Sequence, residues 1–232
     1  MTIIEKRLPR IDESWNKQPP KRKELEAEKQ SLLRFQEALE NDKPISSVEP
    51  TEEEINKYIR PYGLLTGKRM LVVANCSDLT DDQEQKWLED LDKTCAAWGL
   101  SKVVMNAQLE YDLLEFPEEE WEDYFASSGM EGPATSEVIR ESYRVLNQHS
   151  FLTSGEDEVR AWTIPIGMNA QKAAGKIHSD IERGFIRAEV MAFEDLKAAG
   201  TEEALKKEGK VRLEGKEYIV QDGDIINFRF SV

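Results

Sequence analysis

Apolar residues near the N-terminus recur every seven positions, which is the spacing of one helix face. Leu25, Leu32 and Leu39 share this spacing, so the pattern predicts a helix over residues 21–41 with a heptad seam. The preceding Gln18-Pro19-Pro20 would break any helix that reaches it. The pattern therefore predicts two antiparallel helices joined at the prolines, a short coiled-coil arm over residues 1–45.

The first helix of this arm carries a proline within its apolar stripe. Ile4, Leu8 and Ile11 are spaced i, i+4 and i+7, which places them on one helix face. An interior proline costs about 3 kcal/mol, so we expect the helix to start near Pro9 or to be kinked there. The arm either lies on the body of the protein or protrudes and contacts a partner. The cationic cluster Lys21-Arg22-Lys23 at its tip favours the second interpretation.

Residues 46–155 alternate helical and strand-like segments, as an α/β domain does. Thr51 and Glu54 form a capping-box sequence, and Gly63 is placed to end the short helix that follows. Residues 69–74 carry a continuous apolar run, typical of a buried parallel strand, and residues 102–106 predict a second strand. The other segments predict helices over 81–99, 118–125 and 135–146, the first with an apolar face of Trp87, Leu88, Leu91, Cys95 and Trp98.

Residues 156–232 predict a small α+β domain, linked to the preceding part by residues 151–155. Residues 159–164 are rich in β-branched and aromatic side chains and predict a strand. A helix over 170–182, ended by Gly184, and an alternating strand over 186–193 follow. The remaining segments are short helices on both sides of Gly200, a hairpin of 211–213 with 218–220, and a last strand over 225–232. This order predicts a β-grasp, ubiquitin-like fold.

Composition excludes several classes of function. The chain is 39% hydrophobic and 33% charged, and no apolar run approaches the roughly 20 residues of a membrane span. The N-terminus has no apolar signal segment, so we expect a cytoplasmic protein without a membrane partner. Cys76 and Cys95 cannot form a disulfide framework or a cysteine-rich zinc site. His149 and His178 lack partners at metal-ligand spacing, and the dispersed acidic residues single out no catalytic pair.

The net charge of −15 is unevenly distributed. Residues 77–141 contain 18 acidic and 4 basic residues, hence −14, and would repel phosphate. Residues 165–187, by contrast, have a net charge of +2, because only Asp180 and Glu182 oppose the four cations Lys172, Lys176, Arg183 and Arg187. The first two cations are i, i+4, and Arg183 lies seven residues beyond Lys176, so we expect a single helical stripe. Such a stripe predicts contact with RNA phosphate or an acidic protein patch, against the alternative of ordinary solvated lysines.

The apolar strand over 69–74 is followed by Asn75-Cys76-Ser77-Asp78. Ligands of α/β sheets bind at the carboxyl ends of the strands, and an amide with a carboxylate could contact the edge of a purine. A simple turn is the alternative interpretation.

Several strings resemble one family, the Obg-like ATPases of the YchF type. The family's base-recognition strand, which ends in Asn-x-x-Glu, resembles the string LLTGKRMLVVANCSD. Its Ser-Ala-x-x-Glu loop resembles Asn106-Ala107-Gln108-Leu109-Glu110. EVRAWTIPIG, AAGKIHSDIERGFIRAEVMAFED and EGKEYIVQDGDIINFRF resemble its TGS domain. The resemblance implies a helical arm, the second half of a nucleotide domain and a TGS domain. It also implies base contacts from Asn75, Cys76, Asp78, Asn106, Ala107 and Gln108, although Asp78 stands where the family has Glu.

The phosphate-binding string G-x-x-x-x-G-K-[ST] does not occur in the 232 residues. In P-loop nucleoside triphosphatases this string holds the phosphates and Mg²⁺. In family terms the P-loop region is absent, so we expect at most weak binding of ATP or GTP and no hydrolysis by the chain alone. The resemblance implies a translation-associated protein that binds the ribosome or ribosomal RNA. The alternative is one half of a split ATPase whose P-loop is supplied by a partner polypeptide.

Overall fold

The computed structural model describes residues 1–77, 81–117, 120–127, 132–155 and 158–231. They form two compact units, Met1–Glu141 and Ser142–Val232. The fold is mixed α/β, as predicted.

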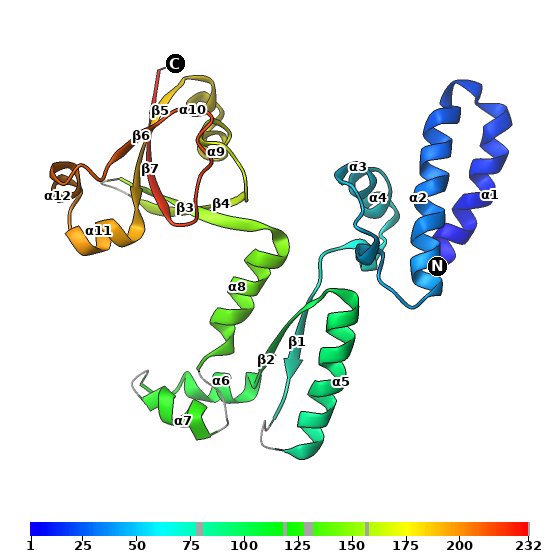
Figure 1. The fold of residues 1–232 in the computed structure, drawn as a ribbon, viewed down its shortest axis with the longest axis horizontal. Helices are drawn as coiled ribbons and strands as arrows, with labels where there is room; N and C mark the ends of the chain where they lie inside the picture. Colours follow the sequence, from blue (N-terminus) through cyan, green and yellow to red (C-terminus); the bar gives the residue numbers. More distant parts are fainter. Residues whose placement is uncertain (78–80, 118–119, 128–131, 156–157, 232) are drawn as a thin grey trace. The chain divides into compact units, whose positions relative to one another are not determined.

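The first unit begins with a hairpin of two helices (Figure 1). Helix α1 spans Thr2–Lys17, a 3₁₀ turn (η1) covers Pro19–Lys21, and α2 spans Arg22–Glu40. The expected start near Pro9 is wrong, because α1 runs through this proline from Thr2. Ile4 and Ile11 are fully buried while Pro9 is exposed. Burial of this apolar face offsets the hydrogen bond that the proline cannot donate.

The core of this arm extends into the segment that follows it. Leu32, Phe35, Ile45 and Ile59 are almost completely buried in one cluster. The predicted capping box is confirmed, since the backbone N–H of Thr51 donates to Glu54 and that of Glu54 to Thr51. Gly63, in the left-handed conformation, ends the helical segment over residues 52–62. The short helical elements after α2 are η2 (Ile45–Val48), α3 (Glu52–Glu54), η3 (Ile55–Ile59), α4 (Arg60–Tyr62) and η4 (Leu65–Gly67).

A parallel strand pair follows. Strand β1, Leu71–Asn75, pairs with β2, Ser101–Met105, and α5, Asp82–Trp98, connects them. Of β1 only Ala74 is buried, whereas Val73 is 42% exposed, so the predicted burial of this strand is wrong. Within the described residues this sheet has two strands, so the side chains that further strands or helices would cover remain exposed.

Helix α5 begins and ends as predicted. The side chain of Asp81 accepts hydrogen bonds from the first turn, and Gly99 ends the helix in the left-handed conformation. Cys95 is buried, but Trp87 and Trp98 are exposed. The predicted apolar face is therefore only partly packed, for the same reason as β1.

Three helices complete the first unit and lead into the second. They are α6 (Ala107–Leu113), α7 (Trp121–Ser127) and α8 (Ala134–Leu146). The predicted helix over 135–146 is confirmed as α8. Residues 118–119 of the predicted acidic helix lie outside the described residues.

The second unit contains a five-stranded sheet in the order β4-β3-β7-β5-β6. Residues 151–155 were expected to be a link, but most of them belong to β3, which pairs antiparallel with β4 and parallel with β7. The expected hairpin is also wrong, because β6 pairs with β5, and residues 218–220 contribute a single bridge, from Ile219 to Asn169. The strands are β3 (Gln148–Ser154), β4 (Val159–Pro165), β5 (Phe185–Ala192), β6 (Arg212–Glu214) and β7 (Asp224–Phe230).

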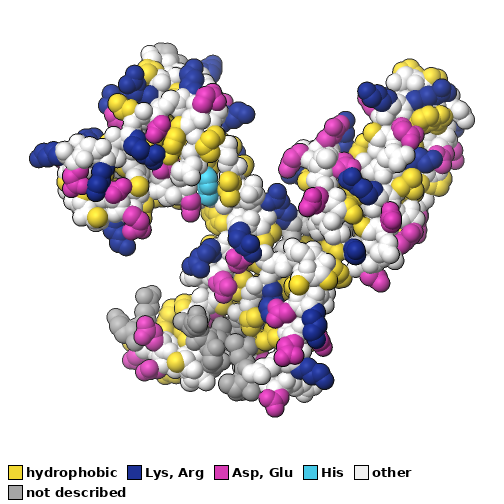
Figure 2. Space-filling view, viewed as in Figure 1, with side chains coloured by type: hydrophobic (Ala, Val, Ile, Leu, Met, Phe, Trp, Pro, Cys, Tyr) yellow, Lys and Arg dark blue, Asp and Glu magenta, His cyan; other side chains and the backbone are white. Residues whose placement is uncertain are grey.

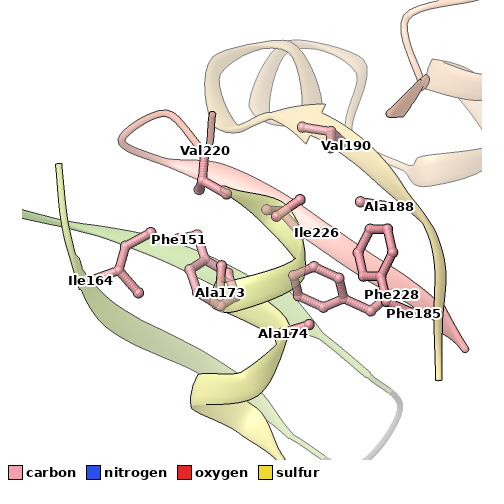
Figure 3. Packing of buried hydrophobic residues seen from close by; sticks show 11 residues of the cluster. Phe151, Ile164, Ala173, Ala174, Phe185, Ala188, Val190, Val220, Ile226 and Phe228 are labelled. Carbon is pink, nitrogen blue, oxygen red and sulfur yellow. The ribbon is translucent and has the colours of Figure 1, made fainter. Parts of the chain in front are cut away.

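Helix α9, Ala170–Ile177, packs on one face of this sheet. Its buried Ala173 and Ala174 lie against aromatic side chains of the strands (Figure 3). The rings of Phe151 and Phe228 meet edge to face, with centroids 5.8 Å apart. Small residues on the helix and large ones on the sheet thus fill the core together.

The predicted helix over 170–182 is divided at His178. This residue is extended, with φ −160° and ψ 143°, and its Nδ1 accepts a hydrogen bond from the backbone N–H of Asp180. His178 thereby caps a separate helix, α10, Ser179–Arg183. Two further helices, α11 (Phe193–Ala199) and α12 (Glu202–Lys207), lie on either side of Gly200 as predicted. The assignment of separate domains to residues 1–45, 46–155 and 156–232 stays a prediction.

Candidate nucleotide-base site and basic surfaces

The two loops predicted to contact a base lie side by side at the carboxyl ends of β1 and β2. Asn75 is opposite Met105 in the strand register, and the backbone N–H of Cys76 donates to the carbonyl of Met105 over 2.8 Å. The side-chain oxygen of Asn75 accepts from the backbone N–H of Ala107 at 3.0 Å. This bond orients the amide of Asn75, whose NH₂ group is then the donor that it can offer to a purine acceptor.

Asn106 ties the two loops together a second time. Its Nδ2 donates to the carbonyl of Ser77 over 2.8 Å, and its Oδ1 accepts from the N–H of Leu109 and caps α6. Ser77 in turn donates through Oγ and N–H to the carboxylate of Glu84, at 2.6 and 3.0 Å. The result is a cross-linked platform built from the ends of two strands.

Of the other residues predicted to contact a base, Gln108 is engaged elsewhere, Cys76 is buried, and Asp78 is not described. The side chain of Gln108 donates to Asp112 on its own helix. The thiol of Cys76 is buried, and burial, with the nearby Glu84 carboxylate, raises its pKa. Asp78 lies outside the described residues. Base contact by these side chains stays a prediction.

Two glutamates that organise the platform were missed as functional residues from sequence. Glu84 holds Ser77, and Glu110, at the end of the second loop, caps α8 by accepting from the N–H groups of Ala134 and Thr135 at 2.7 and 3.2 Å and from the Thr135 hydroxyl. Glu84 lies on α5, seven residues after Ser77, whereas Glu110 lies 24 and 25 residues before Ala134 and Thr135. The signal that could have suggested the second is the lack of a capping side chain in Gly132-Pro133 before α8.

The tip of the arm, residues 17–23, is a compact basic surface, which we call the arm tip. Beyond the predicted Lys21, Arg22 and Lys23, the structure adds Lys17, the last residue of α1. All four are exposed, and none forms an ion pair within the fully described residues 1–77. Arg22 lies over the ring of Trp15, 5.8 Å from its centroid, and donates to its carbonyl. Figure 2 shows Lys and Arg side chains around this end of the arm.

The predicted basic stripe of the second unit is not assembled. Lys172 and Lys176 are both exposed on α9. Arg183 lies on α10 instead, where it pairs with Asp180. Arg187 is on β5 next to the buried Ala188 and so faces away from the core that α9 covers. The structure therefore brings two of the four cations together.

Comparison with known proteins bears on both units. The sequence profile of the YchF-GTPase_C family, "Protein of unknown function (DUF933)", matches residues 148–231. The ribosome-binding ATPase YchF of Bacillus subtilis is 41% identical over 100% of this chain and 63% of that protein. Obg-like ATPase 1 of Caenorhabditis elegans is 35% identical over 100% of this chain and 58% of that protein. The YchF GTPase structure of Schizosaccharomyces pombe has a TM-score of 0.79 at 29% identity, over 98% of this chain and 61% of that chain.

The chain belongs to the YchF/Obg-like ATPase family. It matches the C-terminal part of these proteins and spans about three-fifths of the length of the curated relatives. In family terms, the platform of Asn75 and Asn106 belongs to a partial nucleotide domain, and the five-stranded sheet to the C-terminal domain.

The described residues contain no group of three or more His, Cys, Asp or Glu side chains that could hold a metal ion. Each helix in the same residues is too short or too polar to span a lipid bilayer.

Proposed function

We propose that this chain is a ribosome-associating part of a YchF-type protein and that it contacts ribosomal RNA through the arm tip. The observation that carries the proposal is the charge of residues 17–23, which include four cations and no acidic residue in a chain of net charge −15. Two bacterial relatives named ribosome-binding ATPases support a ribosomal partner.

The arm tip suits phosphate for two physical reasons. Within the part of the chain that the structure describes, its cations form no ion pair with a carboxylate, so phosphate does not have to displace one. The turn at Pro19-Pro20 also limits the backbone freedom that binding would remove, because proline fixes φ. Each lysine that neutralises a phosphate releases condensed counterions, so affinity should fall steeply with salt.

The second unit is, in this proposal, a TGS domain with a β-grasp fold. The helix α9 lying across a mixed five-stranded sheet supports that interpretation. Its exposed Lys172 and Lys176 are a second, weaker basic surface, because they are two cations where the arm tip has four. A cytoplasmic location follows from association with ribosomes.

Nucleotide chemistry is the second part of the proposal. The platform of Asn75 and Asn106 is retained for base contact, whereas nothing in the 232 residues matches the phosphate-binding string. We therefore propose that the chain alone binds ATP or GTP weakly and does not hydrolyse it.

A split ATPase is the alternative function, and one observation favours it. The two-stranded parallel sheet leaves Val73, Trp87 and Trp98 exposed. Parallel sheets are normally covered on both faces, so a polypeptide that adds P-loop strands to β1 would bury these side chains. Magnesium-dependent ATP hydrolysis on mixing the chain with the separately purified P-loop segment of the Bacillus subtilis relative would support this alternative.

The RNA contact is tested by co-sedimentation with Bacillus subtilis ribosomes. We expect the wild-type chain to sediment with a log–log salt slope of about −2 to −4, as for three or four phosphate contacts. The variant Lys17→Glu, Lys21→Glu, Lys23→Glu should lose sedimentation. The control Lys86→Glu, Lys207→Glu, Lys216→Glu makes the same change in net charge at exposed lysines elsewhere.

Three results would count against this assignment. Equal losses in the two triple variants would mean that only net charge matters. Normal sedimentation of the arm-tip variant with loss in Lys172→Glu, Lys176→Glu would move the contact to α9. Failure of the wild-type chain to sediment with ribosomes at low salt would refute the proposal.

A further inference from the structure

Residues 103–139 are an acidic segment that takes no part in the proposed RNA contact, and its helices line an apolar cavity. The segment contains ten Asp or Glu residues and no Lys or Arg. In the structure, α6, α7 and the start of α8 line a cavity of about 460 Å³, whose walls include Tyr111, Leu113, Leu114, Trp121 and Phe125. We call this cavity and its mouth the acidic groove.

The mouth of the acidic groove exposes large apolar side chains. Tyr111 is 69% exposed and Leu114 is 68% exposed. Phe116 and Tyr124 are also exposed and contact each other, with ring centroids 5.2 Å apart. Single exposed apolar residues are ordinary on a protein surface, but a group of them beside a cavity marks a binding surface.

Four carboxylates lie one or two positions in sequence from residues that line the cavity. Asp112 and Glu115 lie on and just after α6, and Glu122 and Asp123 lie on α7. All four are exposed, and within the described part of the chain none of them forms an ion pair. Like charges repel one another, so a cationic occupant would be stabilised and a nucleic acid would be rejected. Figure 2 shows acidic and apolar side chains together over α7.

Hydrogen bonds hold the walls of the acidic groove in place. The indole N–H of Trp121 donates to the carbonyl of Phe116 over 3.1 Å. Glu110 fastens the start of α8 to α6 through its bonds to Ala134 and Thr135. A pre-formed groove binds with less loss of conformational freedom than one that must be assembled.

We propose that the acidic groove binds a basic amphipathic segment of a partner protein. The segment's apolar side chain enters the cavity beside Leu114 and Trp121, and its lysines or arginines face Asp112, Glu115 and the carboxylates of α7. The cavity volume falls in the range of ligand pockets, and an amphipathic helix in a hydrophobic groove is a common mode of peptide recognition. This contact uses charge opposite to that of the arm tip, so the two surfaces would serve different partners.

The test uses the full chain and a synthetic probe. The probe is a fluorescein-labelled 14-residue peptide with leucine or tryptophan at positions i, i+3, i+4 and i+7 and lysine elsewhere. A matched peptide replaces the leucines and tryptophan by alanine and keeps every lysine. Fluorescence anisotropy should show binding of the first peptide at least about tenfold tighter than the second, a difference of 1.4 kcal/mol.

Variants assign this binding to the acidic groove. Leu114→Ser and the pair Asp112→Lys, Glu115→Lys should each weaken binding at least about tenfold. The control pair Glu5→Lys, Glu89→Lys makes the same change in net charge at exposed acids elsewhere and should stay within twofold. These exposed positions are expected to leave the thermal unfolding midpoint unchanged, and the charge pair tests the proposal even if Leu114→Ser does not fold.

Four outcomes would overturn the proposal. Equal binding of the alanine peptide would mean attraction by charge alone. An equal loss in the Glu5, Glu89 control would mean attraction by the chain as a whole. Unchanged binding by Leu114→Ser would exclude the cavity. Dimerisation of the wild-type chain in gel filtration, abolished by Leu114→Ser, would assign the acidic groove to a second copy of this chain.

Discussion

Removal of the Glu28 carboxylate should loosen the arm from its base. Glu28 is buried on α2 and accepts from Arg7 of α1 at 2.6 and 2.9 Å and from the hydroxyl of Tyr62, on α4, at 2.6 Å. Breaking a fully buried ion pair costs about 3–5 kcal/mol. The Arg7 side chain is 33% exposed and can turn to solvent, so we expect about 2–3 kcal/mol for Glu28→Ala after this discount.

Hydrogen exchange measured by mass spectrometry gives the local stability of the arm. A loss of 2–3 kcal/mol should raise exchange of the core amides of α1 and α2 about 30- to 160-fold, since each 1.36 kcal/mol is a factor of ten. The control Asp12→Ala removes the more exposed pair with Lys29, which solvent screens, so exchange should change little. Similar exchange in the two variants, or an increase below about threefold in Glu28→Ala, would refute the role given to this cluster.

The same cluster predicts a pH dependence. Burial alone would raise the pKa of the Glu28 carboxyl, but hydrogen bonds from Arg7 and Tyr62 outweigh it and hold the pKa below its ordinary value. A carboxyl whose pKa is lower in the folded state contributes its full stability above the unfolded pKa and loses it as the pH falls through the folded one. The stability advantage of wild type over Glu28→Gln should therefore shrink below about pH 4.5. An advantage that grows on acidification would contradict this sign.

Three further predictions concern other parts of the chain. Gly184→Ala should destabilise the second unit by about 1–3 kcal/mol in urea unfolding, because its Cβ would lie 2.2 Å from the carbonyl oxygen of Ser231. The control is Gly215→Ala, whose Cβ meets nothing within 4 Å; equal destabilisation by the two variants would contradict the packing argument. Glu110→Gln should weaken the cap of α8 and cost about 1 kcal/mol, with faster amide exchange at Thr135 as the readout; unchanged exchange there would show that the carboxylate is dispensable. ATP should bind the chain with a Kd above about 1 mM, an affinity of less than about 4 kcal/mol, and calorimetry that finds micromolar binding would reveal a phosphate site that sequence reasoning missed.

Local sequence signals predicted the elements of the fold well because their physics is local. Thr51 with Glu54, and Asp81 with Gly99, were read correctly as helix boundaries, since each depends on residues within one helix. The break at His178 was missed because histidine is not a usual capping residue. The start of a helix near Pro9, one of the two expectations, was wrong because the burial of neighbouring residues, which offsets the missing hydrogen bond, depends on α2.

The meeting of the two loops that are predicted to contact a base could be expected from sequence, but the contacts that organise them could not. Asn75 follows the first predicted strand and Asn106 ends the second, so their meeting at one sheet edge was foreseeable. The contacts from Glu84 to Ser77 and from Glu110 to Thr135 join separate elements and leave no spacing pattern in the sequence. The basic stripe was predicted wrongly because its geometry required one helix to continue as far as Arg183, whereas α9 ends at Ile177 and Arg183 lies on α10.

Photocrosslinking at the arm tip tests the central claim most directly. Gln18 is exposed between Lys17 and Pro19, and a photoreactive phenylalanine at this position would report its nearest partner on Bacillus subtilis ribosomes. We expect a crosslink to ribosomal RNA that disappears as salt is raised and is lost with Lys21→Glu, Lys23→Glu. A crosslink to ribosomal protein alone, or no crosslink from a chain that still sediments with ribosomes, would contradict the claim.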